Sequence, residues 1–273
     1  MSDKPGVYTL QSPTPNLVVE KEGTTARVIF NKMVRMNAVS LDMWQAIPQV
    51  MAMLDADPDV RVIVLRGAGD KAFVSGADIS QFEDARANAE QERLYSQATD
   101  EAFRALENVS KPTIAMIRGV CMGGGLAIAT ACDLRYAGEG ATFGIPAARL
   151  GLAYPPQAAQ RLMNIVGPAF AKEIFFTARI FSTEEVLAMR LVNRIYPAGD
   201  LELYVRDICK TIAQNAPLTM KTAKISIDTL ANSAEGMIAQ ELQLLVDLCS
   251  NSEDYAEGRK AFIEKRRPVF RGV

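Results

Sequence analysis

KPTIAMIRGVCMGGGLAIATACDLRYA, residues 111–137, is the stretch that decides the fold. Its apolar run Thr113–Ile117 is typical of a strand that is covered on both faces of a parallel sheet, and residues 134–137 are expected to form a short strand. Between them a glycine cluster leads into an apolar helix that ends near Cys132. A strand, a helix and a second strand in this order predict an α/β unit with a right-handed crossover.

The same alternation extends toward the N-terminus. Apolar periodicity predicts strands at residues 17–20, 27–30 and 61–66 and helices at residues 41–54 and 91–108. The acidic stretch from Glu83 to Glu101 has few apolar anchors, so we expect a solvated helix that covers a pocket, with Glu83 as a weak candidate carboxylate.

The second half of the chain is expected to be mostly helical. A capping box, Ser182 to Glu185, predicts a helix start. Further helices are expected at residues 201–215, 218–231, 234–248 and 252–264. No low-complexity linker separates the halves. The sequence therefore predicts one α/β core followed by a helical C-terminal region.

Composition excludes several kinds of chemistry. The chain has 273 residues, a formal net charge of −2 and no histidine. Histidine-dependent nucleophilic catalysis and HExxH zinc sites are therefore excluded. The charge balance gives no footprint for nucleic-acid binding.

The four cysteines lack CxxC spacing and are expected to be buried, reduced thiols rather than metal ligands. No signal or membrane span is visible, so a cytoplasmic protein without membrane contact is expected.

Two glycine-containing loops each follow a predicted buried strand. The first is RGAGDKAFVSGAD, residues 66–78, and the second is RGVCMGGG, residues 118–125. Glycines at a helix start leave backbone N–H groups open to a ligand, and the helix dipole adds positive potential there. A second backbone donor from residues 75–78 would converge on the same point and form an oxyanion hole. The alternative is that the glycines only permit tight packing of strand and helix.

Motifs along almost the whole chain carry a family resemblance. They are NKMVRMNA (31–38), KAFVSGADI (71–79), KPTIA to MGGG (111–125), ACDL (131–134), ATFG (141–144) and SEDYAEG to FIEKRRP (252–268). In these segments the chain resembles the crotonase, or enoyl-CoA hydratase/isomerase, superfamily. The resemblance implies a spiral of ββα units over residues 1–200 and a helical C-terminal oligomerisation region over residues 201–273. It also implies a homotrimer or a dimer of trimers.

The resemblance further implies a ligand and its contacts. The ligand is an acyl-CoA thioester, as in fatty acid metabolism, and no cofactor is expected beyond the coenzyme A of the substrate. By the resemblance, the oxyanion donors are the backbone N–H groups of Ala77 and Gly124. Contacts to the coenzyme A portion are implied for Met36, Ala38, Ser75, Asp78, Ile79, Ser80, Phe262 and Lys265, the last two often in a neighbouring subunit.

The chain departs from the family pattern at two positions. Where hydratases of the family carry two glutamates, this sequence has Ala127 and Ala147. Neither side chain transfers a proton. Tyr154 is the best remaining proton-bearing candidate, although its ring could simply fill the pocket wall. Decarboxylation of a malonyl-type CoA fits this inventory, because loss of CO₂ forms the enolate without a base.

Other readings of the sequence stay open. The chain could be an enoyl-CoA hydratase or isomerase with a substitute acid/base. It could also be a non-catalytic acyl-CoA-binding subunit, which alanines at both acid/base positions would suit. RNA binding, known for one member of the family, is disfavoured by a sequence pI of about 5.5.

Overall fold

The computed structural model describes residues 6–78, 89–150, 152, 154–232, 244, 248 and 251–273. In these residues the strands form two sheets, in the orders β1-β2-β3-β4-β6-β8-β10 and β5-β7-β9. The larger sheet comprises β1 (Val7–Leu10), β2 (Leu17–Glu22), β3 (Thr25–Phe30), β4 (Val62–Gly67), β6 (Thr113–Ile117), β8 (Leu134–Gly138) and β10 (Arg194–Tyr196). It is antiparallel from β1 to β3 and parallel from β3 to β10. The smaller, parallel sheet comprises β5 (Ala72–Val74), β7 (Val120–Met122) and β9 (Thr142–Gly144).

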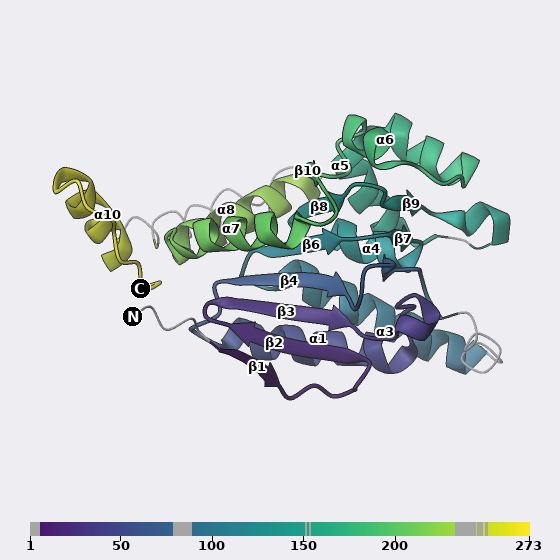
Figure 1. The fold of residues 1–273 in the computed structure, drawn as a ribbon, viewed down its shortest axis with the longest axis horizontal. Helices are drawn as coiled ribbons and strands as arrows, with labels where there is room; N and C mark the ends of the chain where they lie inside the picture. The colour runs from purple at the N-terminus through teal and green to yellow at the C-terminus, as the bar shows by residue number, and fades with distance from the viewer. Residues whose placement is uncertain are drawn as a thin grey trace.

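The chain alternates between the two sheets. β4 and β5 precede helix α3 (Ala89–Asn108), and β6 and β7 precede α4 (Gly124–Ala131). β8 and β9 precede the 3-10 helix η3 (Pro146–Leu150) and α5 (Pro156–Thr177). Each of these units consists of two strands and the helices that follow them, and it adds one strand to each sheet (Figure 1). The expected α/β fold built from ββα units is confirmed.

Two predicted loops contain short strands that the sequence analysis missed. β5 lies inside residues 67–76, and β7 lies beside the glycine cluster. Each has only three residues, which is too short for a period-2 pattern to stand out. Pairing with a neighbouring strand, rather than local propensity, makes them strands.

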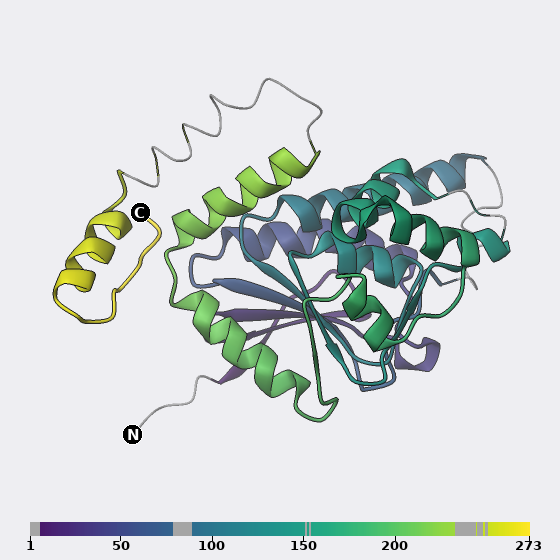
Figure 2. The same ribbon diagram turned by 90° about the horizontal axis from the view of Figure 1, so that it is seen from above.

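Helices cover both faces of the larger sheet (Figure 2). Ile63, Leu65 and Ala115 point into the main core, which includes α1 (Leu41–Ala56) and α3. The alternate residues Val62 and Val64 point the other way, onto Leu201, Val205 and Cys209 of α7 (Leu201–Ala213). Burial on both faces explains why the sequence of β4 is continuously apolar.

The prediction of a solvated helix within the acidic stretch holds for one face of α3, where Ser96, Gln97, Asp100 and Glu101 are exposed, but is wrong for the opposite face. Tyr95, Ala98, Ala102 and Leu106 are buried, and α3 packs against α1. Alanines and a tyrosine are weak hydrophobic signals in a sequence, yet their spacing puts them on one helix face. Glu83 lies outside the described residues.

The helices after α5 agree with the predicted pattern, whereas α5 itself was not among the predicted helices. The capping box at Ser182 and Glu185 is present at the start of α6 (Thr183–Ala188). α7, α8 (Pro217–Asn232) and α10 (Glu253–Ile263) occupy predicted helical ranges. The helix predicted at residues 234–248 falls almost entirely outside the described residues. Since α7 packs on the larger sheet, the first C-terminal helix shares a core with the preceding domain; the division at residue 200 stays a prediction.

Candidate active site

The first loop is held by backbone bonds to residues 36–39. Ser75 N donates to the Met36 carbonyl at 3.1 Å, and Val39 N donates to the Gly76 carbonyl at 2.8 Å. Asp78 N donates to the Val39 carbonyl at 2.9 Å. These bonds form a parallel bridge between Val39 and Ala77. Among the described residues, no hydrogen bond uses the N–H of Ala77. The bridge therefore leaves this N–H available to a ligand.

The three glycines at the start of α4 have different surroundings. Gly123 has φ 51°, and its N–H donates to the Gly144 carbonyl at 2.8 Å. A Cβ on Gly125 would collide with the Val74 carbonyl and lie 2.7 Å from the Val74 Cβ. A Cβ on Gly124 would instead lie 3.5 Å from the nitrogen of Ala77, an ordinary contact distance. Gly125 thus serves packing, whereas Gly124 faces the other predicted donor.

The predicted pair of backbone donors is therefore brought together. Gly124 is the first residue of α4, so its N–H has no partner within the helix. Across the described part of the chain no hydrogen bond takes it up. The dipole of α4 adds positive potential at this point. Two such donors side by side can stabilise negative charge that develops on a carbonyl oxygen.

An aromatic cluster lies directly behind Gly124. Trp44, on α1, places its Cζ2 atom 3.5 Å from the position of a Gly124 Cβ. Its Nε1–H donates to the Tyr95 hydroxyl at 3.1 Å, and its ring lies 5.4 Å from that of Phe103. From the sequence, Trp44 was only one position within the helix predicted at residues 41–54. The sequence offered one signal that could have singled out this residue, because Trp44 is the only tryptophan of the chain.

Tyr154 lies just before α5, with its ring against a second aromatic side chain. The rings of Tyr154 and Phe175 are 4.9 Å apart at an angle of 61°. Burial raises the pKa of Tyr154, and the charge of Arg161 only partly offsets this. The hydroxyl therefore stays protonated through neutral pH. The ring packing agrees with a wall residue, and a proton-donating role stays a prediction.

Ala127 and Ala147 are buried methyl groups. Ala127 lies in the first turn of α4 and is 5% exposed, and Ala147 lies in η3 and is 6% exposed. Whether they replace glutamates of relatives stays an expectation from the resemblance. In the structure both positions lie in the core, and neither carries a titratable group.

The residues predicted to contact coenzyme A fall into two groups. Met36, Ala38, Ser75 and Asp78 lie together in the bridged loops, and Asp78 is 5% exposed and paired with Lys32 at 2.7 Å. Asn37 holds this region by donating to the Ala68 and Ala72 carbonyls at 3.0 and 2.8 Å. Ile79, Ser80 and the side chain of Phe262 lie outside what the structure describes.

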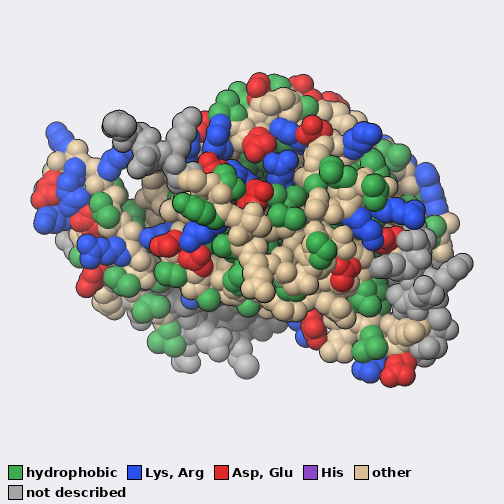
Figure 3. Space-filling view, turned by 60° about the horizontal axis from the view of Figure 1, so that its bottom comes forward, with side chains coloured by type: hydrophobic (Ala, Val, Ile, Leu, Met, Phe, Trp, Pro, Cys, Tyr) green, Lys and Arg blue, Asp and Glu red, His purple; other side chains and the backbone are tan. Residues whose placement is uncertain are grey.

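Lys265 is not brought to this site within one chain. The segment after α10 contacts Arg61, which donates to the Phe270 carbonyl at 3.1 Å. Arg61 precedes β4, whereas the site loops follow the opposite end of that strand. Lys265, Arg266 and Arg267 are exposed, and basic side chains gather at that end of the molecule (Figure 3). A role for Lys265 would therefore require the site of a neighbouring subunit, as the sequence analysis allowed.

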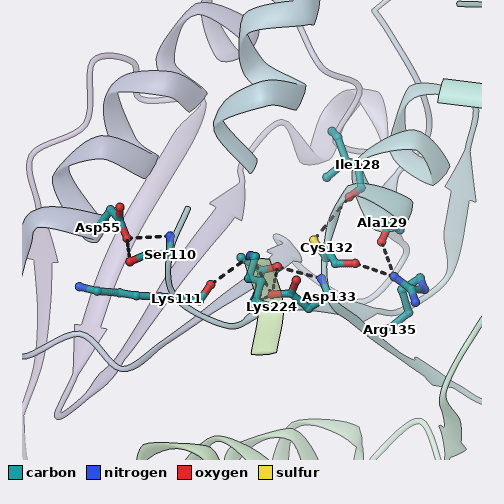
Figure 4. Close-up of polar contacts among 10 residues, drawn as sticks. Asp55, Ser110, Lys111, Ile128, Ala129, Cys132, Asp133, Arg135 and Lys224 are labelled. Carbon is teal, nitrogen blue, oxygen red and sulfur yellow. Dashed lines mark hydrogen bonds and ion pairs between the residues drawn. The ribbon is translucent and has the colours of Figure 1, made fainter. Parts of the chain in front are cut away.

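The C-terminal end of α4 is anchored by polar contacts (Figure 4). Arg135 donates to the carbonyls of Ala129, Cys132 and Leu191, at 3.4, 2.6 and 2.8 Å. Asp133 accepts from Thr113 N at 2.7 Å and from Lys224 of α8 at 3.0 Å. Asp133 thus has a structural role, and these bonds fix the helix that presents Gly124.

Further predictions concern thiols, metals and membranes. Cys121, Cys132 and Cys209 are buried and free, and burial raises the pKa of Cys132 to about 12 and that of Cys209 to about 11. Cys249 lies outside the described residues. Within the described ranges no cluster of three His, Cys, Asp or Glu side chains could hold a metal ion. No helix in the same ranges has the length and apolar character to cross a membrane.

Comparisons with known proteins show which family this chain resembles. A family model described as enoyl-CoA hydratase/isomerase matches residues 20–273. A short-chain-enoyl-CoA hydratase from Clostridium acetobutylicum is 34% identical over 92% of this chain and 96% of its own length. A peroxisomal Δ(3,5)-Δ(2,4)-dienoyl-CoA isomerase from Arabidopsis thaliana is 34% identical over 91% of this chain and 93% of its own.

A solved structure supports the same relation. The crystal structure of an enoyl-CoA hydratase/isomerase family protein from Hyphomonas neptunium matches with a TM-score of 0.90 and 38% identity. The match covers 95% of this chain and 99% of that one. The similarity therefore includes the helical C-terminal region as well as the two sheets.

Proposed function

The chain belongs to the enoyl-CoA hydratase/isomerase family, and we propose that it acts on an acyl-CoA thioester by stabilising an enolate between the N–H groups of Ala77 and Gly124. The observation that carries the proposal is the placement of these two donors. The Ala77 nitrogen lies 3.5 Å from the position of a Gly124 Cβ, and neither N–H is taken up by another described residue.

Enolate stabilisation follows from the properties of these donors. When the thioester carbonyl becomes an enolate, negative charge moves onto its oxygen. Backbone N–H groups already aimed at that oxygen need no rearrangement, and in a partly buried site they act more strongly than in water. Removal of one such donor typically lowers kcat by about 10²- to 10³-fold.

The specific reaction we propose is decarboxylation of a malonyl-type CoA. The bond between the α-carbon and its carboxylate breaks, CO₂ leaves, and the electron pair forms the enolate. The α-carbon then takes a proton. Buried methyl groups at Ala127 and Ala147 support this choice, because no base is needed to form the enolate. Tyr154, whose pKa is raised by burial, is the proposed proton-bearing group.

Hydration or isomerisation of an enoyl-CoA is the second candidate. The names of the two relatives described above, a hydratase and an isomerase, favour it, and neither relative is named a decarboxylase. This candidate requires an acid/base other than residues 127 and 147. Tyr154 could serve, as could Glu83, which lies outside the described residues.

Product analysis separates these reactions. The purified protein is incubated with methylmalonyl-CoA and, separately, with crotonyl-CoA, and the products are identified by mass. Decarboxylation predicts propionyl-CoA from the first ester. Rapid hydration of crotonyl-CoA that is unaffected by Tyr154→Phe would contradict the decarboxylation mechanism and favour the second candidate. Binding of CoA esters without turnover of any ester in a broader panel would indicate a non-catalytic subunit.

A further inference from the structure

We propose that the ion pair between Lys32 and Asp78 holds the oxyanion hole in position, and that Lys32 is a positioning residue for the reaction. The two residues are 46 positions apart in the chain, and their charged atoms lie 2.7 Å apart. The inference rests on the proposed function, because it concerns the direction of the Ala77 N–H. It gives Asp78 a role other than the predicted contact with coenzyme A.

The peptide unit that carries the Ala77 donor is bonded on its other side. The N–H of Ala77 and the carbonyl of Gly76 belong to the same planar, trans peptide. Val39 N donates to this carbonyl at 2.8 Å, and Asp78 N donates to the Val39 carbonyl at 2.9 Å. Because the N–H of a trans peptide points opposite to its carbonyl, these bonds aim the Ala77 donor away from residues 36–39. The direction of the donor therefore depends on where residues 36–39 lie.

Residues 36–39 begin in a strained turn. Met36 and Asn37 have φ values of 52° and 57°, a left-handed conformation that residues other than glycine rarely adopt. Such conformations persist only where the surroundings hold them. The Asn37 side chain accepts from Lys32 N at 3.1 Å, and Asn37 N donates to the Lys32 carbonyl at 3.0 Å. The turn is thus closed on the backbone of Lys32.

The side chain of Lys32 then connects this turn to the loop that carries Ala77. Its Nζ bonds Oδ2 of Asp78, whose side chain is only 5% exposed. A carboxylate this deeply buried requires compensation, because the protein interior solvates an ion poorly. Loss of the ammonium would reduce that compensation and favour movement of Asp78 toward water. Because Asp78 directly follows Ala77, this movement would redirect the donor.

Kinetics distinguish this role of Asp78 from a contact with coenzyme A. Loss of a binding contact raises KM, whereas loss of an interaction made in the transition state lowers kcat. The Asp78 carboxylate bonds Lys32 within the protein, and its charge has the same sign as the phosphates of coenzyme A. We therefore expect kcat, rather than KM, to respond to its loss.

The experiment measures kcat and KM with the ester that wild type turns over in the product analysis. Lys32→Met should lower kcat about 10-fold or more and change KM by less than about threefold, because a misplaced donor loses part of its effect. Lys32→Arg keeps the charge and should recover most of the kcat. Asp78→Asn should resemble Lys32→Met, and the double variant should be no more impaired than the worse single variant.

A second ion pair of the same length provides the matched control. Lys21 pairs with Asp57 at 2.7 Å, and its side chain is 18% exposed, compared with 21% for Lys32. Lys21 lies opposite Ala26 near the start of β3, whereas Lys32 follows the other end of that strand. Lys21→Met should therefore leave kcat and KM unchanged. An equal loss of kcat in Lys21→Met and Lys32→Met would refute the positioning role.

Amide hydrogen exchange tests the same geometry without a substrate. Peptides that cover residues 33–39 and 72–78 should exchange faster in Lys32→Met than in wild type, and Lys21→Met should leave their exchange unchanged. Unchanged exchange in Lys32→Met would overturn the inference, as would its wild-type kcat. A raised KM with normal kcat in Asp78→Asn would overturn it as well. These outcomes leave turnover by wild type intact. If wild type turns over no ester, the proposed function fails, and hydrogen exchange still decides whether the pair holds this loop.

Discussion

Gly123, Gly124 and Gly125 show how three identical residues acquire different roles from their neighbours. Gly123 adopts a positive φ of 51°, Gly125 packs against Val74, and Gly124 faces the Ala77 nitrogen. The sequence analysis left open whether the glycines serve ligand access or packing. The structure assigns packing to Gly125 and leaves access to Gly124, so substitutions can separate the two.

Alanine substitutions at Gly124 and Gly125 should affect different properties, activity in the first case and stability in the second. Gly124→Ala adds a methyl group at ordinary contact distance from Ala77, beside the proposed oxyanion. We expect normal thermal stability with a loss of about 100-fold or more in kcat. Gly125→Ala collides with Val74 and should destabilise the fold by about 1–3 kcal/mol in urea unfolding. Full activity of folded Gly124→Ala would argue against the oxyanion hole.

Tyr154 offers a test that involves pH. If its hydroxyl donates the proton, Tyr154→Phe should lower kcat and leave KM nearly unchanged. Because burial raises its pKa, wild-type activity should show no loss from this group as the pH rises from 6 to about 10. A normal kcat in Tyr154→Phe would mean that the ring lines the pocket wall and that the hydroxyl donates no proton.

The stability of the protein at alkaline pH tests the raised pKa of Tyr154 independently of activity. An unfolded tyrosine loses its proton at about pH 10, whereas partly buried Tyr154 keeps it. The folded state then binds more protons, so its stability falls as the pH rises past that point. Tyr154→Phe should lose less stability than wild type between about pH 10 and 11, measured by thermal unfolding. Identical losses would contradict the raised pKa.

At the scale of elements, α4 is the most dependent on its surroundings. It has eight residues, and isolated helices of that length are unstable in water. Its N-terminus is held by close packing of Gly125 on β5, and its C-terminal carbonyls are held by buried Arg135. The position of the Gly124 donor therefore depends on contacts at both ends.

Removal of the Arg135 guanidinium should destabilise the protein. Arg135→Met leaves the carbonyls of Ala129, Cys132 and Leu191 without their buried donor, and we expect a loss of about 3 kcal/mol or more in urea unfolding. The matched control is exposed Arg194, whose guanidinium bonds, among the described residues, just the carbonyl of its neighbour Asn193. Arg194→Met should change stability by less than about 0.5 kcal/mol. Equal effects of the two substitutions would contradict the anchoring role.

At the scale of the whole molecule, large apolar side chains lie exposed on the helices of the second half. Phe176 is 78% exposed on α5, and Ile227 and Leu230 are 66% and 67% exposed on α8. Exposed apolar groups of this kind are typical of surfaces that another chain covers. They support the proposed trimer or dimer of trimers, and with it a neighbour that supplies Lys265.

Light scattering on the purified protein tests the assembly. We expect a mass of three or six times the 29.8 kDa of one chain. Phe176→Asp and Ile227→Asp each place a charge on one of these exposed positions, and at least one of them should lower the mass without unfolding the subunit. A monomeric wild type would contradict the proposed assembly and the intersubunit role of Lys265.

The sequence by itself determined the α/β class, most of the longer strands and helices apart from α5, the capping box at Ser182 and the two loops that carry Ala77 and Gly124. Local propensity and apolar periodicity are sufficient for these features, since they repeat over many residues. Only the tertiary structure revealed β5 and β7, which exist through pairing with their neighbours, and the burial of α3. It alone brought the Ala77 nitrogen beside Gly124 and put Trp44 behind them. Contacts between segments so far apart in the chain depend on packing, and no local pattern encodes them.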